Sequence, residues 1–262
     1  MADGLPARRP SGGRSLVRRL LPPALVFAVI LAALAVFHPR LREVLGTTPP
    51  PGPDVATREL AAVGVVVIER CELPHDRDAD VRRTLWSLAG CLDDAWTTAL
   101  RRVNRVYEPP VAVNLVASRE EASCGAKDRD WAGIYCPGSR TINVLVEQDW
   151  AFTAMFTLAH EYAHHVQEIV GISGDGRGDE AWSRRLELQA DCLAAVMLRE
   201  VDPGGLAVMR NAGVSGEGEG HTLSERRTHG SAHNSAEWIA RGQREGTVAA
   251  CDTWSAPASE VS

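Results

Sequence analysis

The sequence predicts an α+β fold in which a small sheet packs against two long helices. Three observations support this prediction. Residues 150–170 are mostly apolar and contain neither glycine nor proline, so they are expected to form one helix. A second helical stretch follows at 180–201. Two short segments ahead of both helices, 111–115 and 141–146, alternate apolar with more polar residues, as half-buried strands do.

The N-terminal segment differs in composition from the rest of the chain. Residues 1–19 contain five arginines, and residues 20–37 contain no charged residue. Eighteen apolar residues make about 27 Å of helix, which just spans a thin hydrocarbon core. Basic residues ahead of such a segment favour a cytoplasmic N-terminus. We therefore predict a basic cytoplasmic tail at 1–19, a transmembrane signal-anchor at 20–37 and an extracytoplasmic body.

A cleaved signal peptide is the alternative to the anchor. In that interpretation, Ala33-Leu34-Ala35 is the cleavage site and the body is secreted. Both interpretations export the body. A Pro-rich linker is predicted at 38–56, and residues 57–262 are predicted to form one domain, which is long enough for a sizeable core.

Glycine and proline mark the predicted connections within this domain. The run 63–68 fits either a strand or the end of a helix. A helix is predicted over 78–107, where apolar residues recur at helical spacing until Pro109 and Pro110. The remaining predictions are a loop at 118–139, a stop of the second long helix at Asp202-Pro203-Gly204-Gly205, a mobile loop at 211–222 and a final helix at 235–244.

The charge distribution argues against nucleic-acid binding. The formal net charge is −6, but residues 1–53 carry seven arginines against Asp3 and Glu43, so the rest of the chain carries −11. An acidic body without a basic, aromatic-containing patch is not suited to binding phosphate backbones. No nucleic-acid partner is therefore expected.

The first long helix contains an H-E-x-x-H pattern, His160-Glu161-Tyr162-Ala163-His164. Residues four apart project from nearly the same side of an α-helix, so His160 and His164 can bind one metal ion. Glu161 lies one residue further round the helix, where it can take a proton from a metal-activated water. A hydrogen-bonded or solvated histidine pair without a metal is the alternative.

The third ligand distinguishes the subclasses that share this pattern. Metzincins continue it with a glycine and a third histidine, but Gln167 and Val170 occupy those positions. Glu187, 23 residues after His164, lies in the second long helix and is the predicted third ligand, as in gluzincins. Asp191, one turn further on, is predicted to accept the free N–H of a ligating histidine. A solvated helix face is the alternative for this carboxylate pair, whereas burial would require a cation such as Zn²⁺.

Five blocks of sequence between residues 96 and 254 carry a family resemblance. They are S-C-G at 123–125 with Y-C-P at 135–137, A-H-E-Y-A-H-H-V-Q at 159–167, R-L-E-L-Q-A-D-C at 185–192, T-H-G-S at 228–231, and A-R-G…A-C-D-T-W at 240–254. In order and content they resemble the bacterial putative neutral zinc metallopeptidase family. The chain departs from the usual family pattern at Ala163, at Asn234-Ser235 and in a shortened segment between 202 and 228.

The resemblance implies a zincin-like fold and a bacterial zinc metallopeptidase. Together with the predicted anchor at 20–37, it predicts a membrane-anchored enzyme on the outer side of a bacterial cell membrane. His160, His164 and Glu187 would bind Zn²⁺, and Glu161 would act as general base on a zinc-activated water. The substrate would be a peptide or a protein. An exported zinc-binding scaffold or envelope protein without proteolytic activity is the alternative.

Two further elements are candidates for the active site. His229, in the T-H-G-S block, is a candidate for stabilising the tetrahedral oxyanion, with helix capping or packing as the alternative. The strand at 141–147, or its neighbour, is predicted to frame the substrate cleft by backbone hydrogen bonds. Its alternative is an internal strand that contacts no substrate.

Six cysteines all follow the apolar segment, which suits an oxidising compartment. Six cysteines permit fifteen pairings. Cys124 and Cys136 bracket a short loop and are the first predicted pair. The remaining pairs are then predicted to be Cys192–Cys251, joining the second long helix to the C-terminal tail, and Cys71–Cys91. The alternative is that some are reduced and buried.

Overall fold

The computed structural model describes residues 53–74, 76–78, 80–124, 131–146, 151–172, 179–215 and 228–262. The predicted tail at 1–19, the predicted anchor at 20–37 and most of the predicted linker at 38–56 lie outside these residues. Within the ranges just given, no helix is both long enough and apolar enough to cross a membrane.

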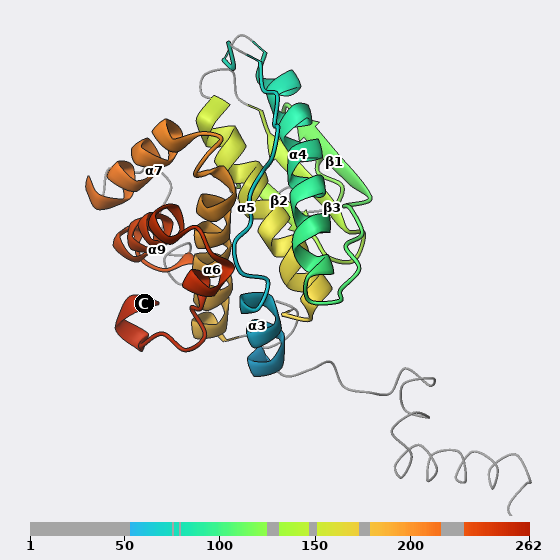
Figure 1. Ribbon diagram of the computed structural model, residues 1–262. Helices are drawn as coiled ribbons and strands as arrows, with labels where there is room; N and C mark the ends of the chain where they lie inside the picture. The colour runs from blue at the N-terminus through green and yellow to red at the C-terminus, as the bar shows by residue number, and fades with distance from the viewer. Residues whose placement is uncertain are drawn as a thin grey trace, which may run out of the picture. The chain divides into compact units, whose positions relative to one another are not determined.

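The described chain combines six helices with one small sheet, which confirms the α+β prediction (Figure 1). The helices are α3 (Pro53–Ala61), α4 (Val81–Arg101), α5 (Ala151–Val170), α6 (Glu180–Leu198), α7 (Pro203–Ser215) and α9 (Ala232–Glu245). The strands are β1 (Ala112–Val116), β2 (Gly133–Cys136) and β3 (Thr141–Leu145). Short 3-10 turns lie at Arg119–Glu121, Val248–Cys251 and Ala258–Glu260.

The three strands are ordered β1-β3-β2, so β3 lies in the middle of the sheet. β1 runs parallel to β3, and β2 runs antiparallel to it. The strand predicted to frame the cleft, 141–147, is therefore the internal strand of this sheet, and its neighbour β2 lies at an edge. Ile142 and Val144 on β3 are fully buried, and both β2 and β3 pack against α5.

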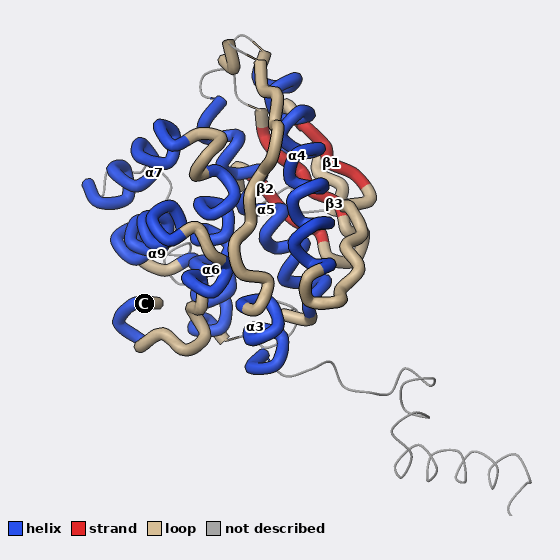
Figure 2. The backbone as a smooth tube through the Cα atoms, in the orientation of Figure 1, coloured by secondary structure: helices blue, strands red, loops and turns tan. Residues whose placement is uncertain are grey.

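Helix α5 lies at the centre of the described fold because the sheet and the helices α3, α4, α6 and α7 all pack against it. The sheet and α4 cover one side, and α6 covers another; α9 in turn packs on α6 and α7 (Figure 2). The apolar residues of α5 and α6 form much of the core, and Leu158, Tyr162 and Leu193 are fully buried. A helix surrounded in this way positions its few polar side chains rigidly.

Local sequence signals define several helix ends. Asp80 accepts a hydrogen bond from the Arg83 N–H at the start of α4, and Asp179 accepts one from the Ala181 N–H at the start of α6. Such side-chain caps satisfy the free N–H groups of a first turn. α9 ends at Gly246, whose φ of 63° is in the left-handed region that glycine favours.

Two predicted connections are in fact regular structure. Residues 203–215, predicted as a helix stop followed by a loop, form α7. Asp202 accepts a hydrogen bond from the Gly205 N–H (3.3 Å), and Pro203 occupies the first turn, where it needs no N–H partner. The predicted loop at 118–139 contains β2. The part of the predicted mobile loop beyond residue 215 lies outside the described residues.

Smaller differences occur in the first third of the domain. The run 63–68 forms no strand. Val63 and Gly64 donate to the Leu60 and Ala61 carbonyls at the end of α3, and Val65 makes a single bridge with Thr247. The helix predicted over 78–107 is shorter at both ends, and the end of the predicted linker belongs to α3. The local sequence alone does not determine these element boundaries.

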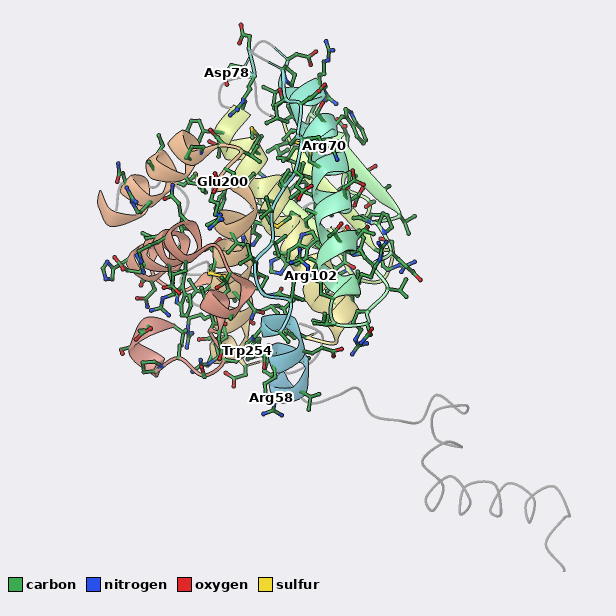
Figure 3. All side chains as sticks on the ribbon, viewed as in Figure 1. Arg58, Arg70, Asp78, Arg102, Glu200 and Trp254 are labelled. Atoms are coloured by element: carbon green, nitrogen blue, oxygen red, sulfur yellow. A yellow bond between two sulfur atoms is a disulfide. The ribbon has the colours of Figure 1, made fainter. Side chains whose placement is uncertain are left out.

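All three predicted disulfides are present (Figure 3). Cys71–Cys91 joins the extended segment after α3 to α4, and Cys124–Cys136 joins the 118–124 segment to β2. Cys192–Cys251 joins α6 to the C-terminal tail across 59 residues. Disulfides persist in oxidising compartments and are rare in the cytosol, so they suit an extracytoplasmic environment.

The packing of α9 against α6 depends on a glycine. A Cβ atom at Gly242 would lie 2.3 Å from the backbone oxygen of Cys192, so the two helices would have to separate. We expect Gly242→Ala to destabilise the protein by about 1–3 kcal/mol, measured by chemical denaturation with the disulfides intact. Gly90→Ala in α4 is the matched control, because no atom lies within 4 Å of its Cβ position. This control should instead stabilise by up to about 1 kcal/mol. Equal effects of the two substitutions would contradict the close packing.

Candidate metal centre

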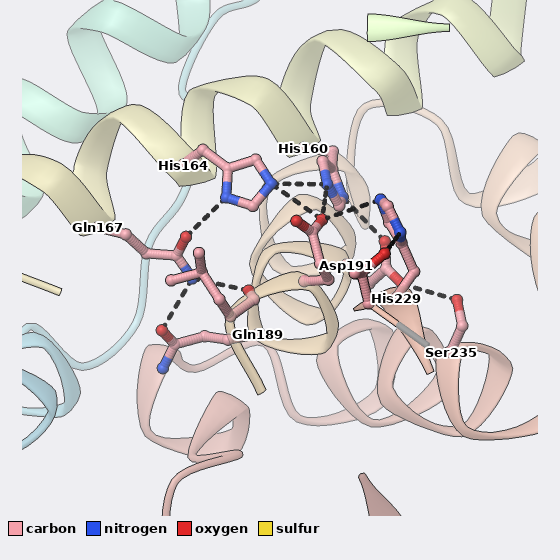
Figure 4. Close-up of polar contacts among 10 residues, drawn as sticks. His160, His164, Gln167, Gln189, Asp191, His229 and Ser235 are labelled. Atoms are coloured by element: carbon pink, nitrogen blue, oxygen red, sulfur yellow. Dashed lines mark hydrogen bonds and ion pairs between the residues drawn. The ribbon is translucent and has the colours of Figure 1, made fainter. Parts of the chain in front are cut away.

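The H-E-x-x-H residues of α5 face α6 across a small polar cluster within the apolar core. His160 and His164 lie one helical turn apart, and their Nε2 atoms are 3.0 Å from each other. Each Nε2 is also 3.1 Å from Oε2 of Glu187 on α6. The structure therefore brings together the three side chains that the sequence predicts as ligands (Figure 4).

The hydrogen bonds on the far side of each ring determine where its proton lies. Nδ1 of His160 lies 2.9 Å from Oδ1 of Asp191, and a carboxylate can only accept, so this nitrogen carries a proton. Nδ1 of His164 lies 2.8 Å from the side-chain oxygen of Gln167. The neutral rings thus present their Nε2 lone pairs to each other and to the Glu187 oxygen.

Three converging lone pairs require a cation between them, and the spacing fits zinc. A tetrahedral ion with bonds of 2.0–2.1 Å holds its ligand atoms roughly 3.3 Å apart. The donor atoms of His160, His164 and Glu187 are 3.0–3.1 Å apart before any ion is considered. Two imidazoles and one carboxylate are also a usual protein donor set for catalytic zinc.

Asp191 is held in turn by a residue from a third helix. Its second oxygen accepts a hydrogen bond from Ser235 of α9 at 2.7 Å. The chain Ser235–Asp191–His160 therefore fixes the orientation of the first ring, as the sequence predicts for Asp191 itself. Ser235 was not predicted, because its approach depends on how α9 packs on α6.

A second chain of contacts, which was not predicted from the sequence, holds His164 in place. The amide nitrogen of Gln167 donates to the Leu186 carbonyl (2.9 Å) and to the side-chain oxygen of Gln189 (3.0 Å). Gln189 then donates to the Cys251 carbonyl at 3.1 Å. Gln167 lies three residues after His164, on the same side of α5. That spacing alone could have predicted a contact between the two side chains.

The electrostatics of the cluster favour positive charge at its centre. Burial lowers the pKa of His160, but hydrogen bonds to Asp191 and Glu187 outweigh it, so that pKa is well above its usual range. Burial also lowers the pKa of His164, but the charge and the hydrogen bond of Glu187, with the charge of Glu161, together outweigh it, so that pKa is raised. The pKa of Glu187 lies well below its usual range, since the two imidazoles outweigh the effect of burial. Protons and a metal ion compete for the same lone pairs.

Glu161 is buried beside this cluster but is not one of its donors. Its side chain is 5 % exposed, and burial raises its pKa above the usual carboxyl value. The backbone N–H of Tyr135 on β2 donates to its carboxylate. Gly133, two residues earlier, leaves the necessary room: a Cβ there would lie 2.8 Å from Oε1 of Glu161. The edge strand β2 therefore holds Glu161 in place.

His229 lies at the margin of the cluster. Its Nε2 is 3.5 Å from Oε2 of Glu187, and its Nδ1 is 2.9 Å from the Thr228 hydroxyl. The side chain is 48 % exposed, much more than the three donor residues. The predicted position beside the site is thus observed, whereas its role in oxyanion stabilisation stays a prediction.

His165 points away from the cluster, as expected for the residue next to His164. Its Nε2 donates to the Glu108 carbonyl (2.7 Å), so its Nδ1 accepts from the Tyr135 hydroxyl (3.1 Å). Burial lowers its pKa, which keeps the ring neutral. This histidine belongs to the packing between α5 and β2.

Asp191→Asn tests the outer contact of His160. The substitution removes the negative charge that orients the ring, so we expect zinc affinity to fall by about 10–100-fold. Competition with a chromogenic chelator measures this loss. Asp94→Asn is the matched control, because Asp94 is exposed on α4. An unchanged affinity in Asp191→Asn would show that the contact does not support the metal site.

Together, the α+β fold and the donor cluster define the H-E-x-x-H class of metal-binding proteins. The chain belongs to the family described as "Putative neutral zinc metallopeptidase", whose sequence model matches residues 70–254. This match confirms the resemblance of the five sequence blocks. The family implies zinc, and in the described residues His160, His164 and Glu187 form a cluster that could hold such an ion.

The relatives found by sequence are bacterial. The chain is 25 % identical to the uncharacterized protein YpfJ of Escherichia coli (strain K12) over 194 residues, which cover 62 % of this chain and 67 % of the relative. It is 26 % identical over 238 residues to the uncharacterized proteins Mb2605 of Mycobacterium bovis and Rv2575 of Mycobacterium tuberculosis, covering 76 % of this chain and 79 % of each relative. No solved structure matches the chain.

Proposed function

We propose that the protein is a zinc metallopeptidase that hydrolyses peptide bonds on the outer side of the membrane. The main support is the convergence of three lone-pair donors beside a buried carboxylate that is not among them. A purely structural zinc site has no need of such a carboxylate. The packing of the sheet and of α6 on the H-E-x-x-H helix also supports a zincin-like fold.

Five residues would bind the ion or orient its ligands. His160, His164 and Glu187 would hold the ion, and Asp191 and Gln167 would orient the two imidazoles. When bound, zinc supplies Lewis acidity that polarises the scissile carbonyl and activates a water. Glu161 would accept a proton from the attacking water on its carboxylate and pass it to the nitrogen of the leaving amine.

Burial and one hydrogen bond suit Glu161 to accept a proton and then release it. Burial raises the pKa of its carboxyl group towards neutrality, and the Tyr135 N–H keeps the carboxylate in one orientation. His229, which reaches the cluster from the segment before α9, is the candidate donor to the developing oxyanion. Its side chain is 48 % exposed, so a substrate could reach the ring.

Peptide release from a random peptide pool, followed by mass spectrometry, tests the proposed activity. We expect cleavage products with the zinc-loaded protein, none after chelation, and their return when zinc is restored. If the zinc-loaded protein is folded but releases no peptides, the proposal fails. The protein would then be a zinc-binding scaffold without proteolytic activity.

The proposed location rests on the basic tail at 1–19, the apolar segment at 20–37 and the three disulfides. The domain that begins with α3 at Pro53 would form the extracytoplasmic peptidase, and 38–52 would link it to the membrane. N-terminal sequencing of the mature protein from membrane fractions tests the anchor. A mature N-terminus near Val36 would show that the segment is a cleaved signal peptide instead.

A further inference from the structure

A cleft opens beside the metal donors at the C-terminal end of α5. It has a volume of about 160 Å³, and its lining includes His164 and Glu187. A cavity of roughly 150 Å³ holds a group the size of benzene. The cleft is therefore large enough for one leucine or phenylalanine side chain, and an occupant would lie next to two of the three metal donors.

Apolar side chains form most of the remaining wall. Tyr135 lies on β2, Pro137 just after it, Ile172 after the end of α5, and Leu186 on α6. Pro137 is exposed, and Tyr135 and Leu186 are half-buried, so these three side chains still present apolar surface to solvent. Covering such surface with another apolar group is favourable, roughly in proportion to the area removed from water.

The polar side chains of the lining already have partners within the protein. The amide nitrogen of Gln167 donates to two oxygens on α6 (Figure 4). The Tyr135 hydroxyl donates to Nδ1 of His165, and Glu168 also interacts within the protein. These groups therefore do not need an occupant of the cleft to satisfy them.

Main-chain oxygens around the cleft are bonded as well. The Gln167 carbonyl accepts from the Ile172 N–H at 2.7 Å, and the Pro137 carbonyl accepts from the Arg140 N–H at 3.2 Å. A polar occupant would give up its hydration to face groups that are already bonded, which costs free energy. An apolar occupant has no hydrogen bonds to lose. The cleft thus favours an apolar group on two grounds, its walls and the engagement of its polar members.

We propose that this cleft binds one uncharged, apolar side chain of leucine or phenylalanine size, next to the scissile bond of a peptide substrate. The inference rests on the proposed peptidase function and specifies its substrate class. The lining combines two metal donors with apolar walls, so the side chain in the cleft would belong to a residue that adjoins the bond at the ion. It would pack on Tyr135, Pro137 and Leu186.

Matched peptides that differ at one position test this proposal. In each pair, one of the two residues that flank the cleaved bond is either leucine or asparagine, which have nearly the same shape but differ in polarity. At one of the two flanking positions we expect kcat/KM to be about 10- to 100-fold higher for the leucine peptide, as for burial of one apolar side chain. Equal values at both positions, or a preference for asparagine, would overturn the inference and leave the peptidase function standing.

A change in the wall of the cleft should alter this preference. Leu186→Ala removes apolar surface but leaves the main-chain carbonyl that supports Gln167. We expect the leucine-to-asparagine ratio to fall by about 3- to 10-fold while the bound zinc is retained. Val208→Ala is the matched control, because Val208 is exposed on α7 and does not line the cleft, and it should keep the ratio. An unchanged ratio in a folded, zinc-loaded Leu186→Ala protein would contradict the proposed occupant.

Calorimetry provides a readout that does not depend on turnover. The zinc-loaded Glu161→Gln protein should bind the blocked tripeptide Gly-Leu-Gly about 10-fold more tightly than blocked Gly-Asn-Gly, and equal affinities would count against the inference. If no peptide of the random pool is cleaved, the peptidase function fails, and the calorimetric ratio still decides whether the cleft binds an apolar side chain. The peptide comparison on the unsubstituted protein needs no variant, so a misfolded Leu186→Ala protein would not prevent the test.

Discussion

Glu161→Gln is expected to lower peptide hydrolysis by about 10²–10⁴-fold while leaving the bound zinc in place. The amide keeps the size of the side chain and an oxygen that can accept from the Tyr135 N–H. It cannot take a proton from water. Zinc should remain because the donor atoms belong to His160, His164 and Glu187. Turnover number and zinc content, measured on the same preparation, provide the test.

The stability of this variant separates a chemical effect from a structural one. Glu161 is buried, so replacing it with a neutral isostere removes a group whose charge is costly to bury. We therefore expect the unfolding midpoint to stay the same or to rise. Full turnover in Glu161→Gln would exclude this residue as the general base, and loss of zinc would place it among the ligands instead.

Glu187→Ala is expected to abolish stable zinc binding and, with it, all hydrolysis. The carboxylate oxygen is the only donor that α6 contributes to the cluster in the described residues, and it lies 3.1 Å from both Nε2 atoms. Removing a direct ligand should cost more than the roughly 100-fold that follows loss of an outer contact. His160→Ala, which removes a donor on α5, should likewise abolish zinc binding and hydrolysis. Zinc content after dialysis and activity on a cleaved peptide measure both effects.

Thermal unfolding adds an independent readout of the same site. A ligand that binds only the folded state raises its stability, by about 4 kcal/mol at a thousand times its Kd. Chelation should therefore lower the midpoint of the wild-type protein and leave that of Glu187→Ala unchanged. His233→Ala, an exposed histidine at the start of α9, is the control and should respond to chelation as wild type does. A zinc-retaining, active Glu187→Ala protein would show that the third ligand lies elsewhere.

The metal donors were predictable because their placement is mostly local. The spacing of His160 and His164 follows from helix geometry alone, and Asp191 lies one turn after Glu187 for the same reason. The encounter of Glu187 with the two histidines required only that two neighbouring helices pack side by side, which α5 and α6 do. Of the cysteine pairs, Cys124–Cys136 was predicted from its short loop, Cys192–Cys251 as a link from the second long helix to the tail, and Cys71–Cys91 as the remaining pair.

The remaining features depend on contacts between distant parts of the chain. Tyr135 reaches Glu161 only because β2 pairs with β3, and a strand as short as Gly133–Cys136 gives too few residues for alternation to be visible. Ser235 reaches Asp191 only through the packing of α9 on α6. The helix α7 was hidden because Pro203 and Gly204 are read as breakers, although proline in the first turn is compatible with a helix.

The disulfide between Cys192 and Cys251 is a covalent link beside the residues that support the donor cluster. Cys192 follows Asp191 in α6, and the Cys251 carbonyl receives the amide of Gln189, which supports Gln167 behind His164. Asp191, which orients His160, and Gln189, which supports Gln167 beside His164, therefore both lie close to a disulfide, and disulfides persist in oxidising compartments. We expect reduction of this disulfide to loosen both supports, because Gln189 and Asp191 lie within one turn of Cys192 on α6.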